Sequence, residues 1–600
     1  RRIAGILFAL VLVSGQVFAQ ETSRIVPNII PPPPPPEPDA VVEQDTMSEN
    51  ERLRAEIELL KKTLAGMEER LAAQEKKADA QAATATAVKE LDRRVMRTER
   101  DNALDRVRLS GDYRFEAHSI QGDVPAHFDG MKLQNLLVKT MFAMNVLGRP
   151  PGSIDEINGA VAGNYGDYLY FTQNLTFDQL KQAMGRIPPE MQQQLMGMLM
   201  PATYTPEYQA DNGILYTNRF RIKLDSQIAP NLSVTARLSM YKVFGDSTGV
   251  QVFNGQPTSL NIDGTTAGVP NGDMLRVERA YFTWSDIADS KFFLSIGRRP
   301  STYGPPLNFR DDEPRGGTPS GALINYQFDG ITFGYKAGEA TTLRLCYGVG
   351  YESGFGNGDL LKRPEDRLDD VHFLGANVDV WNTDRTLVQA TFARAFDVTD
   401  GFNGLAVLPN NPLTGDAVGA PVVMRFSPSA NLGDIDLGGV NVTHKFGPFD
   451  TFVSANFVAF HPDDVTTPFG GLVSDPFETP ERHNGFMIYA GGRYNFGQDE
   501  RTKVGFEFNH GSKYWFNFAQ AEDDIIAPKT NARGNVFEAY FTHRISDRFI
   551  FKGDYIHYRY DYSGSGWHLG APKRLDENPV LGFPTYRTAS MLTAGLMVRF

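Results

Sequence analysis

Hydrophobic and polar residues alternate in short runs from Arg106 to the end of the chain. In the first run, residues 107–118, the odd positions are apolar or small and the even positions are charged or polar. A period of two is typical of a strand whose two faces meet different surroundings. About sixteen such runs follow one another. We therefore predict an all-β protein of about 16 antiparallel strands.

The connections between these runs alternate between short and long. Seven are short, such as 382–385 and 447–450, and eight are long, such as 300–320 and 397–431. Outer-membrane barrels have brief periplasmic turns and long outer loops, whereas a soluble sandwich has no reason to sort its loops in this way. The pattern predicts a closed transmembrane β-barrel over residues 106–600, located in the cell outer membrane.

The end of the chain supports the membrane interpretation. The last run places Leu592, Ala594, Leu596, Val598 and Phe600 on one face. A closing strand that ends on an aromatic residue resembles the signal by which outer-membrane barrels are recognised for assembly. Half-buried strands of a soluble β protein would explain any single run but not this ending. No apolar run reaches the roughly 18 residues that a membrane helix needs, so only strands could span a bilayer.

Three segments precede the first strand. Arg1 and Arg2, an apolar stretch to Val13 and small residues up to Ala19 predict a signal peptide over residues 1–19. Residues 20–46 are a proline-rich linker, in which Pro31–Pro36 should form a polyproline II spacer or docking strip. Residues 47–104 read as a helical segment in the periplasm.

The helical segment carries a heptad seam. Its apolar positions recur at spacings of 4, 3, 4, 3 and 4, at Leu53, Ile57, Leu60, Leu64, Met67 and Leu71. Such a repeat is typical of a coiled coil, although it does not fix the number of chains. We expect a homo-oligomer, with a trimer favoured. The alternative is a single amphipathic helix that packs on a periplasmic or cell-wall partner.

The first long loop, residues 119–212, is predicted to be a helical insertion. Residues 131–147 and 177–200 read as amphipathic helices, and the loop holds eight of the 17 methionines. Methionine fills small cores and also lines adaptable binding surfaces. A self-packed helical lid or plug and a docking surface for a partner therefore both remain open.

Composition and motifs exclude several classes of function. The net charge of -13 argues against a nucleic-acid partner. Cys346 is the only cysteine, so internal disulfides and cysteine-rich metal sites are excluded. One G-x-S-x-G occurs at 245–249, in an outer loop with no helix behind it, so we expect no enzyme. No cofactor motif occurs.

Aromatic residues near strand ends should form a girdle at the lipid headgroups, as at Tyr514, Trp515, Phe516 and Phe518.

The junction between helix and barrel carries a family resemblance. Residues 91–104 (LDRRVMRTERDNAL) followed by 106–115 (RVRLSGDYRF) resemble the start of the barrel in a functionally uncharacterised family of bacterial porin-type outer-membrane proteins with coiled-coil N-termini. The plan is similar to that of general diffusion porins, which have sixteen strands and are usually trimeric. The resemblance implies passive passage of small hydrophilic solutes.

Charged residues are concentrated where such a porin would have its constriction. By the period of two, strands one to three direct six cations at the lumen: Arg108, Arg114, Arg219, Arg221, Lys223 and Arg237. The third long loop follows a strand that ends at Arg298 and Arg299, and it contains Arg310, Asp311, Asp312, Glu313 and Arg315. In sixteen-stranded porins the loop at this place folds inward. We predict an acidic loop that faces a basic wall across water and sets ion preference. The alternative is a solvated outer turn.

Two classes of function compete at this point. The first is an outer-membrane porin for passive diffusion of small hydrophilic solutes or ions. The second is a structural barrel that acts as a sheath for a partner such as a cytochrome, or as a tether between the outer membrane and the cell wall. The chain has no haem motif of its own, so a sheath would need a partner that carries the haem.

Overall fold

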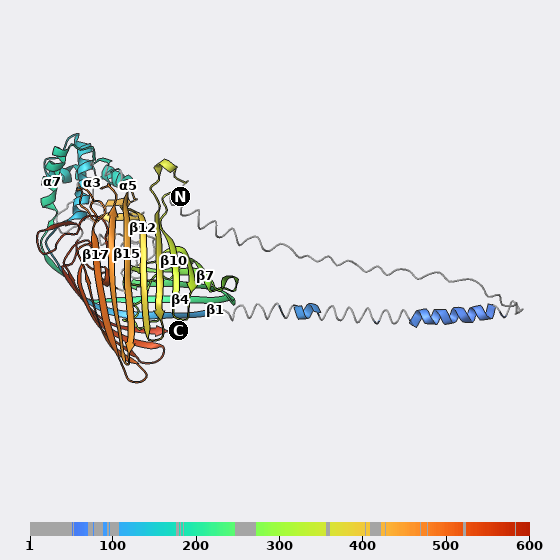
Figure 1. Ribbon diagram of the computed structural model, residues 1–600. Helices are drawn as coiled ribbons and strands as arrows, with labels where there is room; N and C mark the ends of the chain where they lie inside the picture. Colours follow the sequence, from blue (N-terminus) through green and yellow to red (C-terminus); the bar gives the residue numbers. More distant parts are fainter. Residues whose placement is uncertain are drawn as a thin grey trace. The chain divides into compact units, whose positions relative to one another are not determined.

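A computed structural model provides the structure of the chain (Figure 1). It describes residues 51, 53–69, 76, 88–92, 95, 107–175, 179, 182–183, 185–245, 272–355, 361–401, 404–408, 422–426, 428–467, 470–476, 478–519, 524–582 and 584–600. The chain divides into two compact units, residues 1–97 and 98–600. The predicted signal peptide, the proline-rich linker and the G-x-S-x-G serine lie outside the described residues.

The second unit contains a closed barrel of sixteen antiparallel strands. In chain order these are β1 (Val107–Val124), β4 (Tyr208–Ala229), β5 (Leu232–Val243), β6 (Gly272–Trp284), β7 (Phe292–Arg298), β9 (Asp329–Lys336), β10 (Thr342–Tyr351), β11 (Val371–Asn382), β12 (Thr386–Thr399), β15 (Asn431–Phe446), β16 (Phe449–Pro462), β17 (Asn484–Phe496), β18 (Thr502–Gly511), β20 (Gly534–Arg544), β21 (Phe549–Tyr560) and β23 (Thr588–Arg599). Each strand pairs with its neighbours along the chain, and β23 closes the barrel on β1. The predicted fold class is confirmed.

The alternation of side chains explains why these segments form a membrane barrel. On β16, Phe452 and Val458 are buried inside the barrel, whereas Val453 and Phe457 are about half exposed on the outer face. On β1, Asp112 and Arg114 are buried while Tyr113 is exposed. The outer face is therefore apolar around the barrel, and lipid can cover it without leaving any strand edge unpaired.

Short strands outside the barrel belong to its long connections. These are β2 (His127–Asp129), β3 (Tyr204–Thr205), β8 (Ile324–Asn325), β13 (Gly404–Leu408), β14 (Val422–Phe426), β19 (Phe518–Ala519) and β22 (Val580–Gly582). Single 3-10 turns occur at Ile287–Asp289, Pro364–Asp366 and Lys529–Asn531. The β8 and β19 strands pair in parallel, which joins two loops that are almost 200 residues apart in sequence.

The helical insertion differs in detail from the prediction. Strand β1 continues past residue 119 to Val124, and β4 already begins at Tyr208. The helices bounded among the described residues between them are α3 (Gly130–Leu147), α4 (Ile154–Gly163), α5 (Tyr165–Asn174) and α7 (Pro189–Ala202). The pattern at 154–174 was missed because each helix there has only ten residues and therefore a short periodic signal.

The insertion packs as a unit at the end of the barrel that carries the long loops (Figure 1). Leu133, Leu136, Ile157 and Leu199 form its core, with Met196, Met198 and Met200 packed against it. The β2 strand pairs with β22 from the loop before β23, and α5 contacts β14 from the loop before β15. These three methionines thus help to fill a core, and the insertion lies between loops from different parts of the rim.

In the first unit, residues 53–69 form a helix, as the heptad seam predicts. The seam residues of this single chain are exposed, with Leu60 64% and Met67 64% accessible. No helix among the described residues is long and apolar enough to cross a membrane. The coiled coil over 47–104 therefore stays a prediction, because only part of the segment is described and association needs a second chain.

Candidate functional site in the barrel lumen

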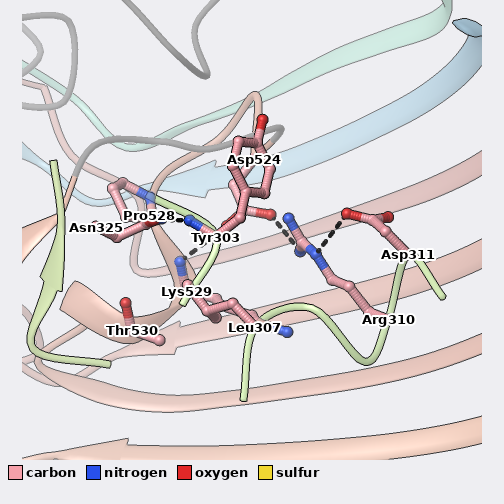
Figure 2. Close-up of a pocket in the computed structure, with 9 residues that line it drawn as sticks. All are labelled: Tyr303, Leu307, Arg310, Asp311, Asn325, Asp524, Pro528, Lys529 and Thr530. Atoms are coloured by element: carbon pink, nitrogen blue, oxygen red, sulfur yellow. Dashed lines mark hydrogen bonds and ion pairs between the residues drawn. The ribbon is translucent and has the colours of Figure 1, made fainter. Parts of the chain in front are cut away.

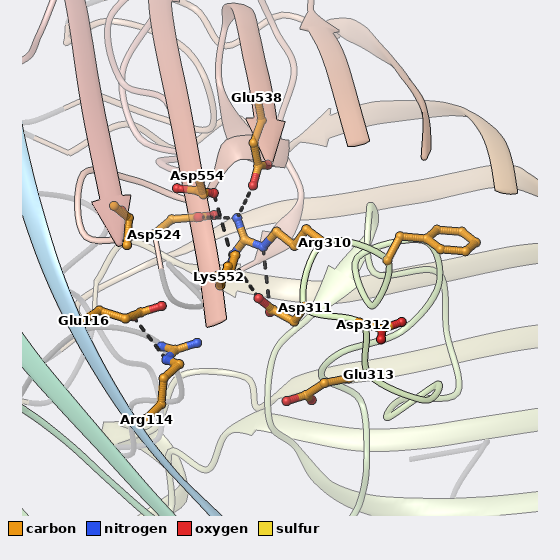
Figure 3. A network of polar contacts seen from close by, with 12 residues as sticks. Arg114, Glu116, Arg310, Asp311, Asp312, Glu313, Asp524, Glu538, Lys552 and Asp554 are labelled. Carbon is orange, nitrogen blue, oxygen red and sulfur yellow. Dashed lines mark hydrogen bonds and ion pairs between the residues drawn. The ribbon is translucent and has the colours of Figure 1, made fainter. Parts of the chain in front are cut away.

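The connection from β7 to β9, residues 299–328, folds into the lumen. We call its charged segment the hub, made of Arg310, Asp311, Asp312, Glu313 and Arg315. Hub side chains contact inward-facing residues of strands β4, β11, β17, β18, β20 and β21, which lie on several sides of the barrel. Figure 3 shows the contacts with Glu538 of β20 and Lys552 of β21. Only a segment inside the barrel can reach all of these strands. The alternative of a solvated outer turn is therefore wrong.

The acidic hub residues pair with basic residues of the wall. Asp311 lies 2.7 Å from Lys552 of β21. Asp312 lies 2.6 Å from Lys503 of β18 and 3.2 Å from Arg493 of β17. These side chains are largely buried as well as in contact, so removal of one partner would leave an uncompensated charge.

The hub also meets two arginines of β4. Glu313 lies 2.7 Å from Arg221 and 3.6 Å from Arg219, and both arginines also contact Asp112 of β1. The ring of Tyr303, from the same inward connection, lies 5.4 Å from the Arg221 guanidinium. A cation over an aromatic face is a favourable contact. Glutamate and tyrosine together hold the connection against the basic wall.

The basic hub residues pair in the opposite sense. Arg310 lies 2.6 Å from Asp524 and 3.5 Å from Glu538 of β20 (Figure 2, Figure 3). Arg315 lies 3.1 Å from Asp379 of β11. The hub thus has three consecutive acidic residues flanked by two arginines, and its charges pair with opposite charges on several strands and on the next inward connection.

A second connection also enters the lumen. We call the described residues 512–519 and 524–533, between β18 and β20, the inner loop. Its Lys529 is buried and forms ion pairs with both Glu507 of β18 and Glu538 of β20. Figure 2 places Lys529 and Asp524 beside Arg310 and Asp311 of the hub. The inner loop therefore supplies part of the hub's charge environment, and sequence analysis missed it because no local pattern marks its inward course.

An apolar core fills the other side of the lumen. It joins residues of the two inward connections, including Leu323 and Trp515, to inward residues of β15, β16 and β17, including Leu437, Phe460 and Met487. Trp515 is fully buried, and its ring N–H donates to the Thr530 carbonyl at 2.7 Å. The aromatic residues Trp515, Phe516 and Phe518 were expected at the lipid headgroups, and that expectation is wrong. Their apolar surface is buried inside the barrel.

Burial of the wall shows how completely these parts fill the middle of the barrel. Inward polar residues on five strands are almost inaccessible: Arg219 (1%), Gln389 (0%), Asn441 (0%), Glu507 (1%) and Glu538 (1%). A wall that lined a wide aqueous channel would expose such side chains to water. The structure is therefore that of a barrel with a filled waist, in which the expected water gap between loop and wall is replaced by contact.

Two carboxylates in the inward connections respond differently to burial. Burial opposes ionisation of Asp311, but Lys552 and Arg310 outweigh it and hold the pKa of this carboxyl well below its usual range. Burial raises the pKa of Asp524, although Arg310 and Lys529 act against the rise. A lowered pKa stabilises the fold above the ordinary value of about 3.9 and loses that effect only as the pH falls further. The Asp311 pair should therefore persist into acid.

The remaining predicted pore residues occupy varied positions. Arg114 and Arg237 are buried on the inner wall, paired with Glu116 and Glu278. Arg108 and Lys223 lie on the same inner face; Arg108 is exposed near the start of β1, and Lys223 is half-buried and pairs with Asp225. Arg298 lies 3.4 Å from Asp329. Arg299 is partly buried, with its guanidinium 6.0 Å from the Tyr281 ring.

Acidic residues on the inner wall were missed by sequence analysis. Asp112, Glu278, Asp379, Glu507 and Glu538 all face inward and are buried. They alternate with basic residues along or across the strands, so the wall is mixed in charge rather than uniformly basic. The period of two could have found them, because they share the inward parity of the cations. No cluster of metal-binding side chains occurs among the described residues.

Comparison with known protein families identifies the chain's relatives. Residues 209–600 of this 600-residue chain match the family described as "Protein of unknown function (DUF3373)". The chain belongs to this family. The resemblance noted at the helix–barrel junction is confirmed in so far as the family is uncharacterised and the barrel is of porin type. No curated protein sequence matches the chain.

Solved structures with similar folds include outer-membrane proteins of three bacteria. OmpT of Vibrio cholerae is 10% identical, with 82% of this chain and 97% of that chain covered and a TM-score of 0.35. The anion-selective porin from Comamonas acidovorans is 9% identical, with 82% and 100% covered and a TM-score of 0.38. The channel DcaP of Acinetobacter baumannii is 12% identical, with 82% and 97% covered and a TM-score of 0.34. Likeness at this level adds nothing to what the strand pairing establishes.

Proposed function

We propose that this protein is an outer-membrane porin for small hydrophilic solutes or ions, with the hub as its constriction. The observation that carries the proposal is the set of ion pairs that fixes the hub across the lumen. A barrel with only a structural role could close its interior with apolar side chains alone. Here one side of the lumen is closed by a charged segment. Water and ions can replace the ion pairs that hold this segment.

The hub also explains how a filled barrel could conduct. Asp311, Asp312 and Glu313 are held by basic groups of the wall at 2.6 to 3.2 Å. Ion pairs of this kind exchange for hydration at a small net cost when both partners become solvated together. Displacement of the hub from β4, β18 and β21 would open a polar path along a wall of mixed charge, on which the basic residues that held the hub would be exposed. We therefore place solute passage on the side of the lumen that faces β1 and β4.

The sheath alternative is weaker. A partner protein inside the barrel would have to displace the hub, the inner loop and the apolar core, which includes the fully buried Trp515. The tether alternative concerns the N-terminal unit and does not conflict with a pore. We propose that the long loops face outward and that the N-terminal segment lies in the periplasm, because brief turns are periplasmic in bacterial barrels.

Solute passage can be tested with the purified full chain in liposomes. The wild type should allow slow entry of small sugars, faster than protein-free vesicles and falling with solute size. A variant with Asp311→Asn, Asp312→Asn and Glu313→Gln should allow faster entry. If neither protein exceeds protein-free vesicles, the porin proposal is wrong.

Assembly of the N-terminal segment is a separate proposal. The exposed seam at Leu53, Ile57, Leu60, Leu64 and Met67 would be covered in a coiled coil of several copies. A peptide of residues 47–102 should sediment as an oligomer, with a trimer favoured. The matched control replaces Leu60 and Leu64 by Asn and should be monomeric. A monomeric parent peptide at high concentration would remove the proposal.

A further inference from the structure

A second cavity lies inside the barrel, away from the hub. Its volume is about 100 Å³, and it lies between the connection that carries the hub and the inner faces of β9, β10, β11 and β12. Pro300, Pro319 and Phe328 line it from the connection, and Thr332, Cys346 and Ala393 line it from the wall. It is distinct from the small gap beside Arg310 that Figure 2 shows.

The composition of the wall explains why this space is not filled. The inward positions here are small: Gly330, Thr332, Cys346, Gly348, Gly375, Thr391 and Ala393. On β15 to β17, by contrast, the inward positions carry large side chains of the apolar core. Two aromatic rings, Phe328 and Phe373, lie 4.8 Å apart between their centroids at the edge of the space. The cavity is therefore mainly apolar, and its rings provide flat surfaces for a planar ligand.

One cation at this cavity has no anionic partner. Arg299 lines the space, lies near the Cys346 thiol and has its guanidinium over the Tyr281 ring. Among the described residues it forms no ion pair, and its Nη1 is shielded from water without a hydrogen-bond partner. The neighbouring Arg344, in contrast, lies 2.9 Å from Asp379. A shielded charge without a counter-ion is costly unless a ligand supplies one.

We propose that this cavity binds a small monocarboxylate with a flat apolar body, such as an aromatic acid. The carboxylate would pair with the Arg299 guanidinium, whose fork matches a carboxylate in two parallel hydrogen bonds. The ring would lie against Phe328, Phe373 and the small-residue wall. The cavity is smaller than the enclosed engineered cavity of about 150 Å³ that holds benzene, but it is open on part of its surface, so a single ring can enter with one edge inside it. This inference rests on the proposed function and deepens it, because it names a class of solute that the porin would carry.

Binding can be measured without conduction. Full-length protein in detergent is dialysed against radiolabelled benzoate, with benzamide as the uncharged ligand of the same shape and acetate as the charged ligand without a ring. Benzoate should bind at least tenfold more tightly than either. Location is measured with Cys346, the only cysteine in the chain. Benzoate should slow its reaction with a small uncharged methanethiosulfonate, because the thiol lines the same cavity.

Variants separate the charge from the cavity. Arg299→Gln should weaken benzoate binding at least tenfold and leave benzamide binding unchanged, whereas Arg299→Lys should retain part of it. Ala393→Leu should weaken both ligands by filling the space. The matched control is Arg385→Gln, an exposed arginine in the turn between β11 and β12, which should change neither. Heat-modifiable migration on gels checks that each variant forms its barrel.

Two results would overturn the inference. The first is benzoate binding no tighter than benzamide binding in the wild type. The second is benzoate binding that Arg299→Gln leaves unchanged. Liposome entry of benzoate then tests transport separately. Tight binding without entry of any solute would refute the porin proposal and keep the site, whereas sugar entry without benzoate binding would refute the site and keep the porin.

Discussion

The two sides of the barrel lumen are filled by different chemistry. Towards β4, β18 and β21, the hub is held by ion pairs such as Glu313 with Arg221 and Asp311 with Lys552. Towards β15, β16 and β17, Trp515 and its neighbours form an apolar core. Apolar burial stabilises whatever the ionic strength, whereas charge pairs weaken with salt and with neutralisation. In the proposed porin, the charged side is therefore the one that would open, while the apolar side would keep the inward connections in place.

This contrast assigns separate roles to the two parts of one loop. Leu323 and Tyr326 of the β7–β9 connection belong to the apolar core, and the hub begins at Arg310 in the same connection. The β8–β19 pair joins this connection to the inner loop beside the core. An anchored base and a charged, displaceable segment are what a constriction loop needs. This contrast between the charged and the apolar side can be tested by mutating residues of each side and measuring both stability and conductance.

The largest expected effect on stability comes from the apolar core. Trp515→Ala should lower the free energy of unfolding by about 3–5 kcal/mol, because it leaves a cavity where a fully buried indole packs. Urea unfolding in detergent micelles measures the change. Phe355→Ala, at an exposed position in an outer loop, is the control and should change it by less than about 0.5 kcal/mol. A loss at Trp515 no larger than that of the control would contradict the account of the core.

A somewhat smaller loss is expected inside the charged region. Lys529→Met leaves the buried Glu507 and Glu538 without their shared cation, although Arg310 still lies 3.5 Å from Glu538. The free energy of unfolding should fall by about 3 kcal/mol, since breaking a buried pair leaves an uncompensated charge. Lys573→Met removes a surface pair with Asp475 and should cost at most about 1 kcal/mol. Equal losses in the two variants would mean that Lys529 is hydrated.

Sequence patterns predicted the barrel because the alternation of side chains that a barrel strand needs is visible within each short segment of the sequence. Every strand must alternate side chains between lipid and lumen, so residues 107–118 already display the rule, and the alternation of loop lengths follows from chain topology. The inward course of the hub was also expected, but through the resemblance to porins rather than through a pattern of its own residues.

The filling of the lumen could not be predicted in the same way. The Arg310–Asp524 and Lys552–Asp311 contacts join residues 214 and 241 positions apart. No period along the chain encodes such pairs. The aromatic run near Trp515 was misassigned because an aromatic girdle and an internal apolar core have the same composition, and only the path of the inner loop distinguishes them. The cavity beside Arg299 depends on small residues from four strands, each unremarkable alone.

The smallest expected effect is the response of the wild type to salt. Raising potassium chloride from 0.1 to 1 M shortens the Debye length from about 10 Å to about 3 Å, although buried pairs are screened less than exposed ones. Single-channel conductance should therefore rise somewhat more than in proportion to bulk conductivity, as the hub leaves the wall more often. Trp515→Ala should keep the same salt response. Strict proportionality in the wild type would indicate a hub that does not move.

Single-channel recording of the neutralised hub tests the central claim most directly. In the variant with Asp311→Asn, Asp312→Asn and Glu313→Gln, the basic groups Arg221, Lys503 and Lys552 lose their charged hub partners, and Arg221 keeps only Asp112 of β1. Neutralising the exposed Asp576 and Glu577 in an outer loop to Asn and Gln is the matched control. The account predicts a severalfold rise in conductance at low salt and a reversal potential shifted toward anions in the hub variant alone. Conductance and selectivity equal to the wild type would contradict it.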